Sequence, residues 1–191
     1  MKIAIAGYGV VGRGTHELLL MNRDKIAARA GEEIEVKYVL DPKPLEGTPA
    51  EQLKASGIEE ILADPEVKLL VEAIGGVGPA YEYVKAALES GRSVVTPNKQ
   101  LVAEKGAELL AIAREKNVGF LFEASVAGGT PVLHPISQCL WANDLDLAAG
   151  ILNGTTNYIL TKMVQEGAGF EETLREAQRL GYAEADPTAD I

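Results

Sequence analysis

The sequence predicts an α/β fold: a doubly wound, mostly parallel sheet, followed by an incomplete α+β domain. Three observations predict it. Short apolar runs alternate with helical patterns from residue 3 to residue 123, as expected of parallel strands with helices on both faces of a sheet. The first apolar run ends in a glycine-rich turn that leads directly into a helical pattern. After Glu123 the sequence becomes rich in glycine and small residues, which indicates a hinge between residues 1–128 and residues 129–191.

The glycine-rich turn follows residues 3–6 and reads Gly7-Tyr8-Gly9-Val10-Val11-Gly12. With this spacing, Gly7 allows a sharp bend, Gly9 lets the backbone approach a pyrophosphate, and Gly12 lets the helix pack closely on the strand. The N–H groups at the helix start attract a diphosphate. The pattern therefore predicts a Rossmann-type domain that binds a dinucleotide through residues 7–12. The alternative is a glycine turn in another kind of α/β protein.

The first helix is expected to continue to Ala30, with three apolar residues on its buried face: Leu18, Leu19 and Ile26. The next strand covers residues 34–41 and ends at Asp41. In dinucleotide-binding folds an acidic residue here accepts the hydroxyls of the adenosine ribose, which favours NAD and repels the 2′-phosphate of NADP. Lys43 could instead reach that phosphate, and Asp41 could serve only the turn before Pro42.

The rest of the first domain alternates in the same way. Helical segments are expected at residues 58–62, 79–90 and 100–116, and strands at residues 68–74, 93–95 and 118–122. Ligands of such sheets bind beyond the carboxyl ends of the strands. This rule places four further residues in the cofactor crevice: Gly75, Gly76, Lys99 and Glu123.

Lys99 is the main candidate for chemistry in this crevice. It follows Thr96-Pro97-Asn98 at the carboxyl end of a strand, where a lysine can bind phosphate, hold a substrate or move a proton. The alternative is a solvated lysine at a helix start, although positive charge is disfavoured there. Glu123 ends another strand beside small residues, an arrangement that suits either an oxygen-bound cation or a simple hydrogen bond.

The second domain is predicted from four segments. Residues 132–142 are expected to be helical, residues 145–152 to form a strand, and residues 153–157 to turn into a helix at 158–166. A final amphipathic helix covers residues 170–180. A single strand cannot satisfy its own backbone groups, so this domain needs partner strands from other sequence or from another chain. Its exposed edge would favour self-association.

Composition restricts the possible partners. The chain has 191 residues and a net charge of -10 with no basic tract, so nucleic acid and anionic membranes are not expected to bind. No apolar run is long enough to span a bilayer, and no secretory leader is recognisable. Cys139 is the single cysteine, which excludes an internal disulfide and favours the reducing cytoplasm. Because its surroundings are apolar, Cys139 is expected in the core.

Taken together, five motifs resemble homoserine dehydrogenase over the whole chain. They are the Gly7-x-Gly9-x-x-Gly12 turn, Thr96-Pro97-Asn98-Lys99, the run from Glu123 to Pro131, the run from Gly150 to Asn157, and Gly181-Tyr-Ala-Glu-Ala-Asp-Pro187. The first motif is generic, whereas the last three together are specific. The resemblance implies an NAD- or NADP-dependent oxidoreductase that interconverts L-homoserine and L-aspartate 4-semialdehyde, in threonine, methionine and isoleucine biosynthesis.

The resemblance also implies site residues. Gly75 and Lys99 would line the nicotinamide side, and Lys99 and Glu184 would be catalytic. Four residues would contact the amino-acid substrate: Gly154, Thr155, Tyr182 and Glu184. A structural sodium ion would be held by Glu123 and the carbonyls of Val126, Gly128 and Thr130. The full-length protein would be a homodimer that acts on a small molecule.

The sequence departs from the family pattern in two places. Many relatives carry an arginine near the second strand that suits NADP, whereas here the strand ends in Asp41-Pro42-Lys43. The family motif also continues past Ile191 with an aspartate and a lysine that handle substrate and proton. The chain is therefore expected to bind cofactor but to turn over poorly, which leaves a dinucleotide-binding fragment without turnover as the alternative. A phosphorylating semialdehyde dehydrogenase is a further alternative, and it would require Cys139 as nucleophile.

Overall fold

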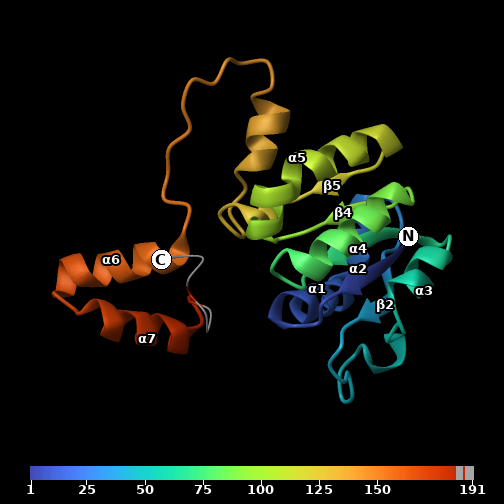
Figure 1. The fold of residues 1–191 in the computed structure, drawn as a ribbon, viewed down its shortest axis with the longest axis horizontal. Coiled ribbons are helices and arrows are strands. Elements are labelled where there is room, and N and C mark those ends of the chain that lie inside the picture. Colours follow the sequence, from blue (N-terminus) through green and yellow to red (C-terminus); the bar gives the residue numbers. More distant parts are fainter. Residues whose placement is uncertain (184–186, 188–191) are drawn as a thin grey trace. The chain divides into compact units, whose positions relative to one another are not determined.

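The computed structural model describes residues 1–183 and residue 187 of the chain. The chain divides into two compact units, Met1–Gly128 and Gly129–Ile191 (Figure 1). The first unit contains the sheet, and the second contains two α-helices and a short π-helical segment.

The first unit is built on five parallel strands: β1 (Lys2–Ala6), β2 (Glu35–Leu40), β3 (Val67–Glu72), β4 (Ser93–Val95) and β5 (Phe120–Leu121). Their order in the sheet is β2-β1-β3-β4-β5, and every pairing is parallel. The chain moves outward in one direction from β1 to β2 and in the other from β3 to β5. The predicted doubly wound parallel sheet is therefore confirmed, and its switch point lies between β1 and β3.

The helices of this unit are α1 (Val10–Met21), α2 (Arg23–Ala30), α3 (Ile58–Ala63), α4 (Gly78–Glu89) and α5 (Lys99–Lys116), with short 3-10 turns η1 (Glu51–Leu53) and η2 (Glu123–Ser125). The expected single helix to Ala30 is wrong, because the chain breaks at Asn22. The backbone N–H and the side-chain amide of Asn22 both donate to the carbonyl of Leu18, which ends α1 there. Leu18 is exposed, not buried as expected.

The core lies on both faces of the sheet because side chains alternate along β1. Ala4 and Ala6 face one layer, which packs on α3, α4 and α5 through Ile61, Leu88 and Leu109. On the other face, Ile3 and Ile5 pack with Val36, Val39 and Leu45. Figure 1 shows the helices of this unit around the sheet.

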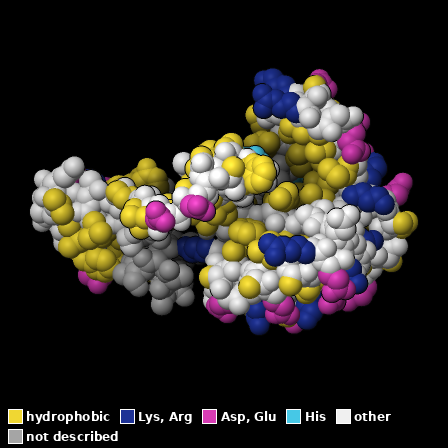
Figure 2. All heavy atoms as spheres, turned by 90° about the horizontal axis from the view of Figure 1, so that it is seen from above, with side chains coloured by type: hydrophobic (Ala, Val, Ile, Leu, Met, Phe, Trp, Pro, Cys, Tyr) yellow, Lys and Arg dark blue, Asp and Glu magenta, His cyan; other side chains and the backbone are white. Residues whose placement is uncertain are grey.

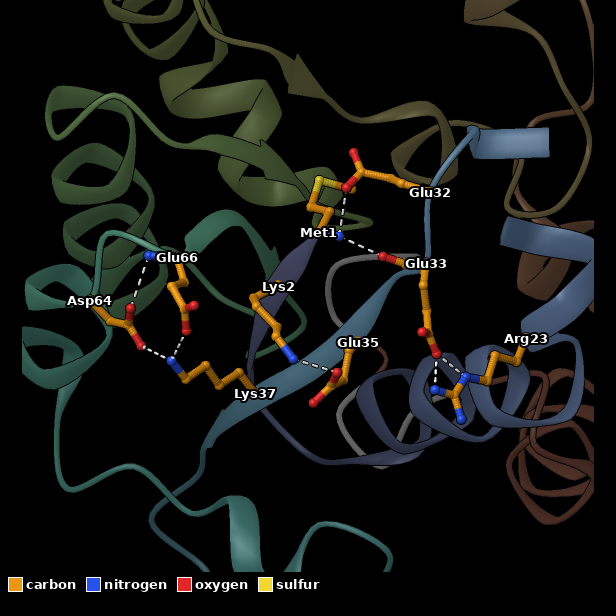
Figure 3. A network of polar contacts seen from close by, with 9 residues as sticks. All are labelled: Met1, Lys2, Arg23, Glu32, Glu33, Glu35, Lys37, Asp64 and Glu66. Carbon is orange, nitrogen blue, oxygen red and sulfur yellow. Dashed lines mark hydrogen bonds and ion pairs between the residues drawn. The ribbon is translucent and has the colours of Figure 1, made fainter. Parts of the chain in front are cut away.

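A network of charged groups lines the amino ends of β1, β2 and β3 (Figure 3). Lys37 lies 2.6 Å from Asp64 and 2.5 Å from Glu66, and the Met1 ammonium lies 2.7 Å from Glu32. Two more pairs join Lys2 to Glu35 and Arg23 to Glu33. This edge is opposite the one to which the glycine turn belongs, so the network contributes to the fold and not to the predicted site.

The second unit contains the short π-helical segment η3 (Pro135–Cys139) and the helices α6 (Gly154–Glu166) and α7 (Phe170–Leu180). Helix α6 begins earlier than expected, because the Asn153 side chain accepts the Thr156 N–H at 2.8 Å and caps it. Three residues between Glu166 and Phe170 join the helices. Ile159, Ala177 and Ala183 are buried where α6 and α7 meet.

Two expectations for this unit are wrong. Residues 145–152 form no strand, because no other described segment of the unit offers a partner, and Leu145, Leu147 and Ile151 are exposed. The helix expected at residues 132–142 is present but shorter, over residues 133–139, and Cys139 is exposed, not in the core. Figure 2 shows hydrophobic side chains on the visible surface of this unit. Within the described part of the chain, no helix combines the length and the apolar character needed to cross a membrane.

Candidate functional site

The glycine turn connects β1 to α1 at the switch point of the sheet. Gly7 has a φ of +92°, and a Cβ added to it would lie 2.5 Å from the carbonyl carbon of Ala73. A Cβ on Gly12 would lie 1.9 Å from the carbonyl oxygen of Gly7. Both positions therefore require glycine, one for its backbone conformation and contact with β3, the other for the approach of α1 to the turn.

Gly9 differs from its two neighbours because it faces open space. No atom lies within 4 Å of a Cβ placed on it, and it is the N-cap of α1. The next residue, Val10, is 93% exposed. An uncovered helix start preceded by an unhindered glycine fits a pyrophosphate, which needs N–H donors and close approach of the backbone.

Asp41 fastens the glycine turn to the end of β2. Its Oδ2 accepts the Tyr8 N–H at 2.6 Å, and its Oδ1 accepts the Lys43 N–H at 2.8 Å. Asp41 therefore does serve the turn after β2, and each carboxyl oxygen still has capacity to accept a ribose hydroxyl. Both proposed roles of Asp41 are compatible in this geometry.

A hollow of about 580 Å³ lies beside the turn, at the carboxyl ends of β1, β2 and β3. Its lining includes the glycines Gly7 and Gly9 of the turn. The polar or charged side chains of the lining are those of Asp41, Lys43, Lys54, Ser56 and Tyr83. The Lys54 ammonium donates to the backbone carbonyl of Lys43 at 2.9 Å, which holds this second lysine at the hollow. Sequence reasoning missed Lys54 and Ser56, because nothing in residues 42–57 indicates that this loop returns to β2.

The Tyr8 side chain anchors the turn to α1 through His16. Its hydroxyl lies 2.8 Å from Nδ1 of His16, and the two rings meet edge to face. Both side chains are buried, and this burial raises the pKa of the Tyr8 phenol and lowers the pKa of His16. The Tyr8 side chain and its N–H are thus both used within the turn, by His16 and by Asp41.

The glycine pair after β3 forms a second turn at the same edge of the sheet. Gly75 and Gly76 have φ of +83° and +66°. Glu72, fully buried at the end of β3, accepts the N–H groups of Ile74 at 2.7 Å and Gly75 at 3.2 Å. Glu72 was not identified as a site residue from the sequence. An acidic residue at the end of an otherwise apolar strand could have indicated it.

Lys99 is the first residue of α5 and is exposed. The residue before it, Asn98, caps the helix by accepting the Leu101 N–H at 3.0 Å and donates its amide to the Gly76 carbonyl at 2.6 Å. The structure thus ties the start of Lys99's helix to the glycine pair. Within the described residues, the hollow beside the first turn is lined by neither Gly75, Gly76 nor Lys99.

The predicted cation ligands straddle the boundary between the units. Glu123 begins η2, and Ala127 and Gly128 both have left-handed backbone conformations, with φ of +59° and +58°. The boundary follows Gly128, so Thr130 belongs to the second unit. No group of three acidic, histidine or cysteine side chains suited to a metal occurs among the described residues. A site built from carbonyls at Val126, Gly128 and Thr130 stays a prediction.

In the second unit, a hollow of about 350 Å³ is lined by five residues: Gly154, Asn157, Tyr158, Thr161 and Tyr182. The structure thus brings together Gly154 and Tyr182, two of the predicted substrate residues. Thr155 is buried, and its hydroxyl donates to the Tyr182 carbonyl at 2.7 Å. The rings of Tyr158 and Tyr182 lie 5.1 Å apart. Tyr158 was missed, although it lies one turn after Gly154 on the same helix; Glu184 lies outside the described residues.

Comparison with known proteins gives consistent results for both units. The model of the homoserine dehydrogenase NAD-binding domain matches residues 7–123, and the homoserine dehydrogenase model matches residues 131–191. The homoserine dehydrogenase of Pseudomonas aeruginosa is 47% identical over this whole chain and 44% of its own length, and that of Bacillus subtilis is 41% identical over 45% of its length. The chain thus spans less than half the length of these curated relatives.

Solved structures agree with this result. A homoserine dehydrogenase from Thiobacillus denitrificans has a TM-score of 0.90 and 44% identity, covering 100% of this chain and 45% of that one. A hyperthermophilic archaeal homoserine dehydrogenase in complex with NADPH has a TM-score of 0.82 and 29% identity, covering 100% of this chain and 65% of that one.

Proposed function

This chain belongs to the homoserine dehydrogenase family, and from that premise we propose that it is part of an oxidoreductase that interconverts L-homoserine and L-aspartate 4-semialdehyde with NAD or NADP. One observation supports the cofactor most directly. Gly9 is unhindered at the uncovered start of α1, where β1, β2 and β3 end around a hollow.

The cofactor is assigned to the residues that fit it. The backbone of residues 7–12 would hold the pyrophosphate, and Asp41 with Lys43 would hold the adenosine ribose. Gly75, Gly76 and Lys99 would line the nicotinamide half. When bound, the cofactor supplies or accepts a hydride at its nicotinamide ring.

The choice between NAD and NADP depends on opposing charges in the hollow. Asp41 predicts NAD, because its carboxyl group would repel a 2′-phosphate. Its two oxygens each accept a backbone N–H, however, and Lys43 and Lys54 add two cations to the same hollow. We propose that the hollow admits both cofactors and that these lysines make NADP binding possible.

Lys99 is proposed to hold or move the proton at the substrate oxygen, where general acid–base catalysis contributes. Four residues of the second unit are proposed to bind the substrate ammonium and carboxylate groups: Gly154, Thr155, Tyr182 and Glu184. The shared hollow of Gly154 and Tyr182 supports this assignment.

Further proposals rest on the family premise and on surface chemistry. A sodium ion would be bound by Glu123 and the carbonyls of Val126, Gly128 and Thr130. The exposed apolar side chains of residues 145–152 support the need for a partner strand, and thus a homodimer of the full-length protein. The net charge of -10 is consistent with a cytoplasmic protein that binds neither nucleic acid nor membranes.

A second candidate function is dinucleotide binding without turnover. It is favoured by the second unit, whose candidate substrate hollow depends on one helix pair with a small described core. A phosphorylating semialdehyde dehydrogenase receives no support, because both matching family models are those of homoserine dehydrogenase.

The test combines a binding and a rate measurement on the purified chain. NADH or NADPH titration by fluorescence should give saturable binding, and its absence would contradict the cofactor assignment. Steady-state oxidation of homoserine should be slower than in a version extended past Ile191, since loss of a general acid costs typically about 10²–10⁴ in rate. Equal rates would show that Lys99 and the substrate residues present here suffice, and would exclude the second candidate.

A further inference from the structure

Glu72 is a buried acidic residue whose position the fold alone does not require. It ends β3, a strand that otherwise contributes Leu70 and Val71 to the apolar layers, and its exposed fraction is 0%. Burying a carboxyl group is costly unless hydrogen bonds replace its water. An apolar residue would fill the same space without that cost, so the partners of Glu72 indicate its role.

Those partners all belong to the carboxyl edge of the sheet. One oxygen, Oε1, accepts the N–H groups of Ile74 and Gly75, which lie in the turn after β3. The other, Oε2, accepts the hydroxyl of Thr96, which follows β4. Glu72 therefore joins the ends of two neighbouring strands through three hydrogen bonds.

The same connection continues to α5. Thr96 is 1% exposed, and its hydroxyl accepts the Asn98 N–H at 3.0 Å. The Asn98 amide in turn donates to the Gly76 carbonyl at 2.6 Å. The glycine pair is thus held from both sides, by Glu72 at the N–H of Gly75 and by Asn98 at the carbonyl of Gly76. Both glycines have positive φ, and these contacts hold the turn in that backbone conformation.

The location of this network connects it to the cofactor. In a doubly wound sheet the pyrophosphate lies at the first glycine turn and the adenosine over β2, so the nicotinamide half extends across the switch point toward β3 and β4. Resting on the function proposed above, we propose that Glu72 is a positioning residue: with Thr96 and Asn98 it fixes the Gly75–Gly76 turn and the start of α5 for the nicotinamide half of the cofactor.

If Glu72 had a purely structural role, its replacement would weaken the binding of both halves of the cofactor or of neither. The proposal can therefore be tested by measuring the two halves separately. The first probe is NADH or NADPH, whichever binds more tightly. The second probe is ADP-ribose if that cofactor is NADH, or 2′-phospho-ADP-ribose if it is NADPH. Both forms of ADP-ribose lack the nicotinamide ring. The Glu72→Gln variant keeps the size of the side chain. Its amide oxygen can still accept the turn N–H groups, but its NH2 group then faces the Thr96 hydroxyl, whose hydrogen loses its carboxylate acceptor.

We expect Glu72→Gln to weaken dinucleotide binding about tenfold and to leave ADP-ribose binding within about twofold, because one or more buried hydrogen bonds near the nicotinamide half are lost. Glu89→Gln is the matched control, since Glu89 is exposed at the last residue of α4, beside the amino edge of β4. It removes the same charge and should change neither affinity. Thermal unfolding followed by circular dichroism shows that each variant is folded.

Thr96→Val and Thr96→Ser give a second, milder pair for the case in which Glu72→Gln does not fold. Valine removes the hydroxyl and should reproduce the selective loss, whereas serine keeps the hydroxyl and should restore dinucleotide affinity. Equal losses for the dinucleotide and ADP-ribose, or no loss for either, would overturn the proposal. If the unmodified chain bound neither probe, the proposed function itself would fail; if it bound ADP-ribose as tightly as the dinucleotide, only the positioning role would fail.

Discussion

Residues 1–128 and residues 129–191 use their apolar residues in different ways. In the first unit, β1 sends Ile3 and Ile5 to one layer and Ala4 and Ala6 to the other, and helices or loops cover both. In the second unit, the described core consists of Ile159, Ala177 and Ala183 with a few partly buried neighbours. Larger apolar residues such as Leu147 and Val164 are exposed there.

The difference shows what a parallel sheet supplies to a site. In the first unit, hydrogen bonds from neighbouring strands fix both glycine turns, so the candidate cofactor residues are held by a complete core. In the second unit, the hollow at Gly154 and Tyr182 depends on one helix pair and on the bond from Thr155 to the Tyr182 carbonyl. A precise substrate site there needs support from additional structure.

The strongest test of this comparison separates the units. Residues 1–128 produced alone should unfold cooperatively and bind NADH or NADPH as the whole chain does. Residues 129–191 alone should show no cooperative thermal transition, because domains of about 60 residues or fewer are marginal even when they bury a larger core. Circular dichroism of both pieces gives the measurement. A sharp transition in residues 129–191 would show that α6 and α7 suffice for stability.

The glycines of the first turn separate folding from binding. Gly9→Val should leave the fold intact, since nothing lies near its Cβ position, but should fill the space of the pyrophosphate and weaken NADH and NADPH binding by roughly a hundredfold, or about 2.7 kcal/mol. Gly12→Ala should instead lower the unfolding temperature, because its Cβ would overlap the Gly7 carbonyl. Unchanged affinity in Gly9→Val would contradict the pyrophosphate assignment.

The fold of the first unit could be predicted because its signals are local. Alternating apolar runs and glycine or proline boundaries indicated β1 to β5, and the Gly7–Gly12 spacing indicated the turn. The break at Asn22 was missed, since it depends on one side chain competing for the Leu18 carbonyl. The strand expected at residues 145–152 failed for another reason: its pattern suits a strand, but pairing requires a partner that the pattern does not supply.

The site could be predicted only where it lies at strand ends. Topology placed Gly7, Asp41 and Gly75 at one edge of the sheet, but it did not identify Lys54, whose loop returns to β2 through the Ala55 N–H and the Val39 carbonyl. The hydrogen bond from Thr96 to Glu72 was also beyond the pattern, because it joins residues more than 20 positions apart. Such contacts depend on tertiary structure.

Cofactor selection tests how the hollow of the first unit uses charge. Lys54→Ala should weaken NADPH binding about 3–10-fold and leave NADH binding nearly unchanged, because an exposed lysine makes a modest, salt-dependent contact with a 2′-phosphate. Dissociation constants for both cofactors at one ionic strength give the result. Lys68→Ala is a suitable control, since Lys68 is exposed on β3 outside the hollow. Equal losses for NADH and NADPH would show that Lys54 supports the loop and does not select the cofactor.

The smallest expected effect concerns the charged network at the amino edge of the first unit. Hydrogen bonding to Lys37 holds the pKa of Asp64 below its ordinary value of 3.8, and Asp64 in turn is the main cause that raises the pKa of Lys37 above 10.5. The Asp64 contribution to stability is thus complete above about pH 4 and is lost as the pH falls through its lowered pKa, while the Lys37 contribution is lost only above pH 10.5.

Asp64→Asn should therefore lower the urea midpoint of the first unit at pH 7 and at pH 5, and the difference from the unmodified chain should shrink at pH 3 and below. Glu166→Gln is the comparison from the second unit, where Glu166 forms a surface pair with Lys162 at 3.0 Å. It should leave that midpoint unchanged at every pH, because exposed pairs contribute little and this one lies outside the sheet unit. An Asp64→Asn effect of equal size at pH 7 and in strong acid would show that packing, not charge, gives Asp64 its role.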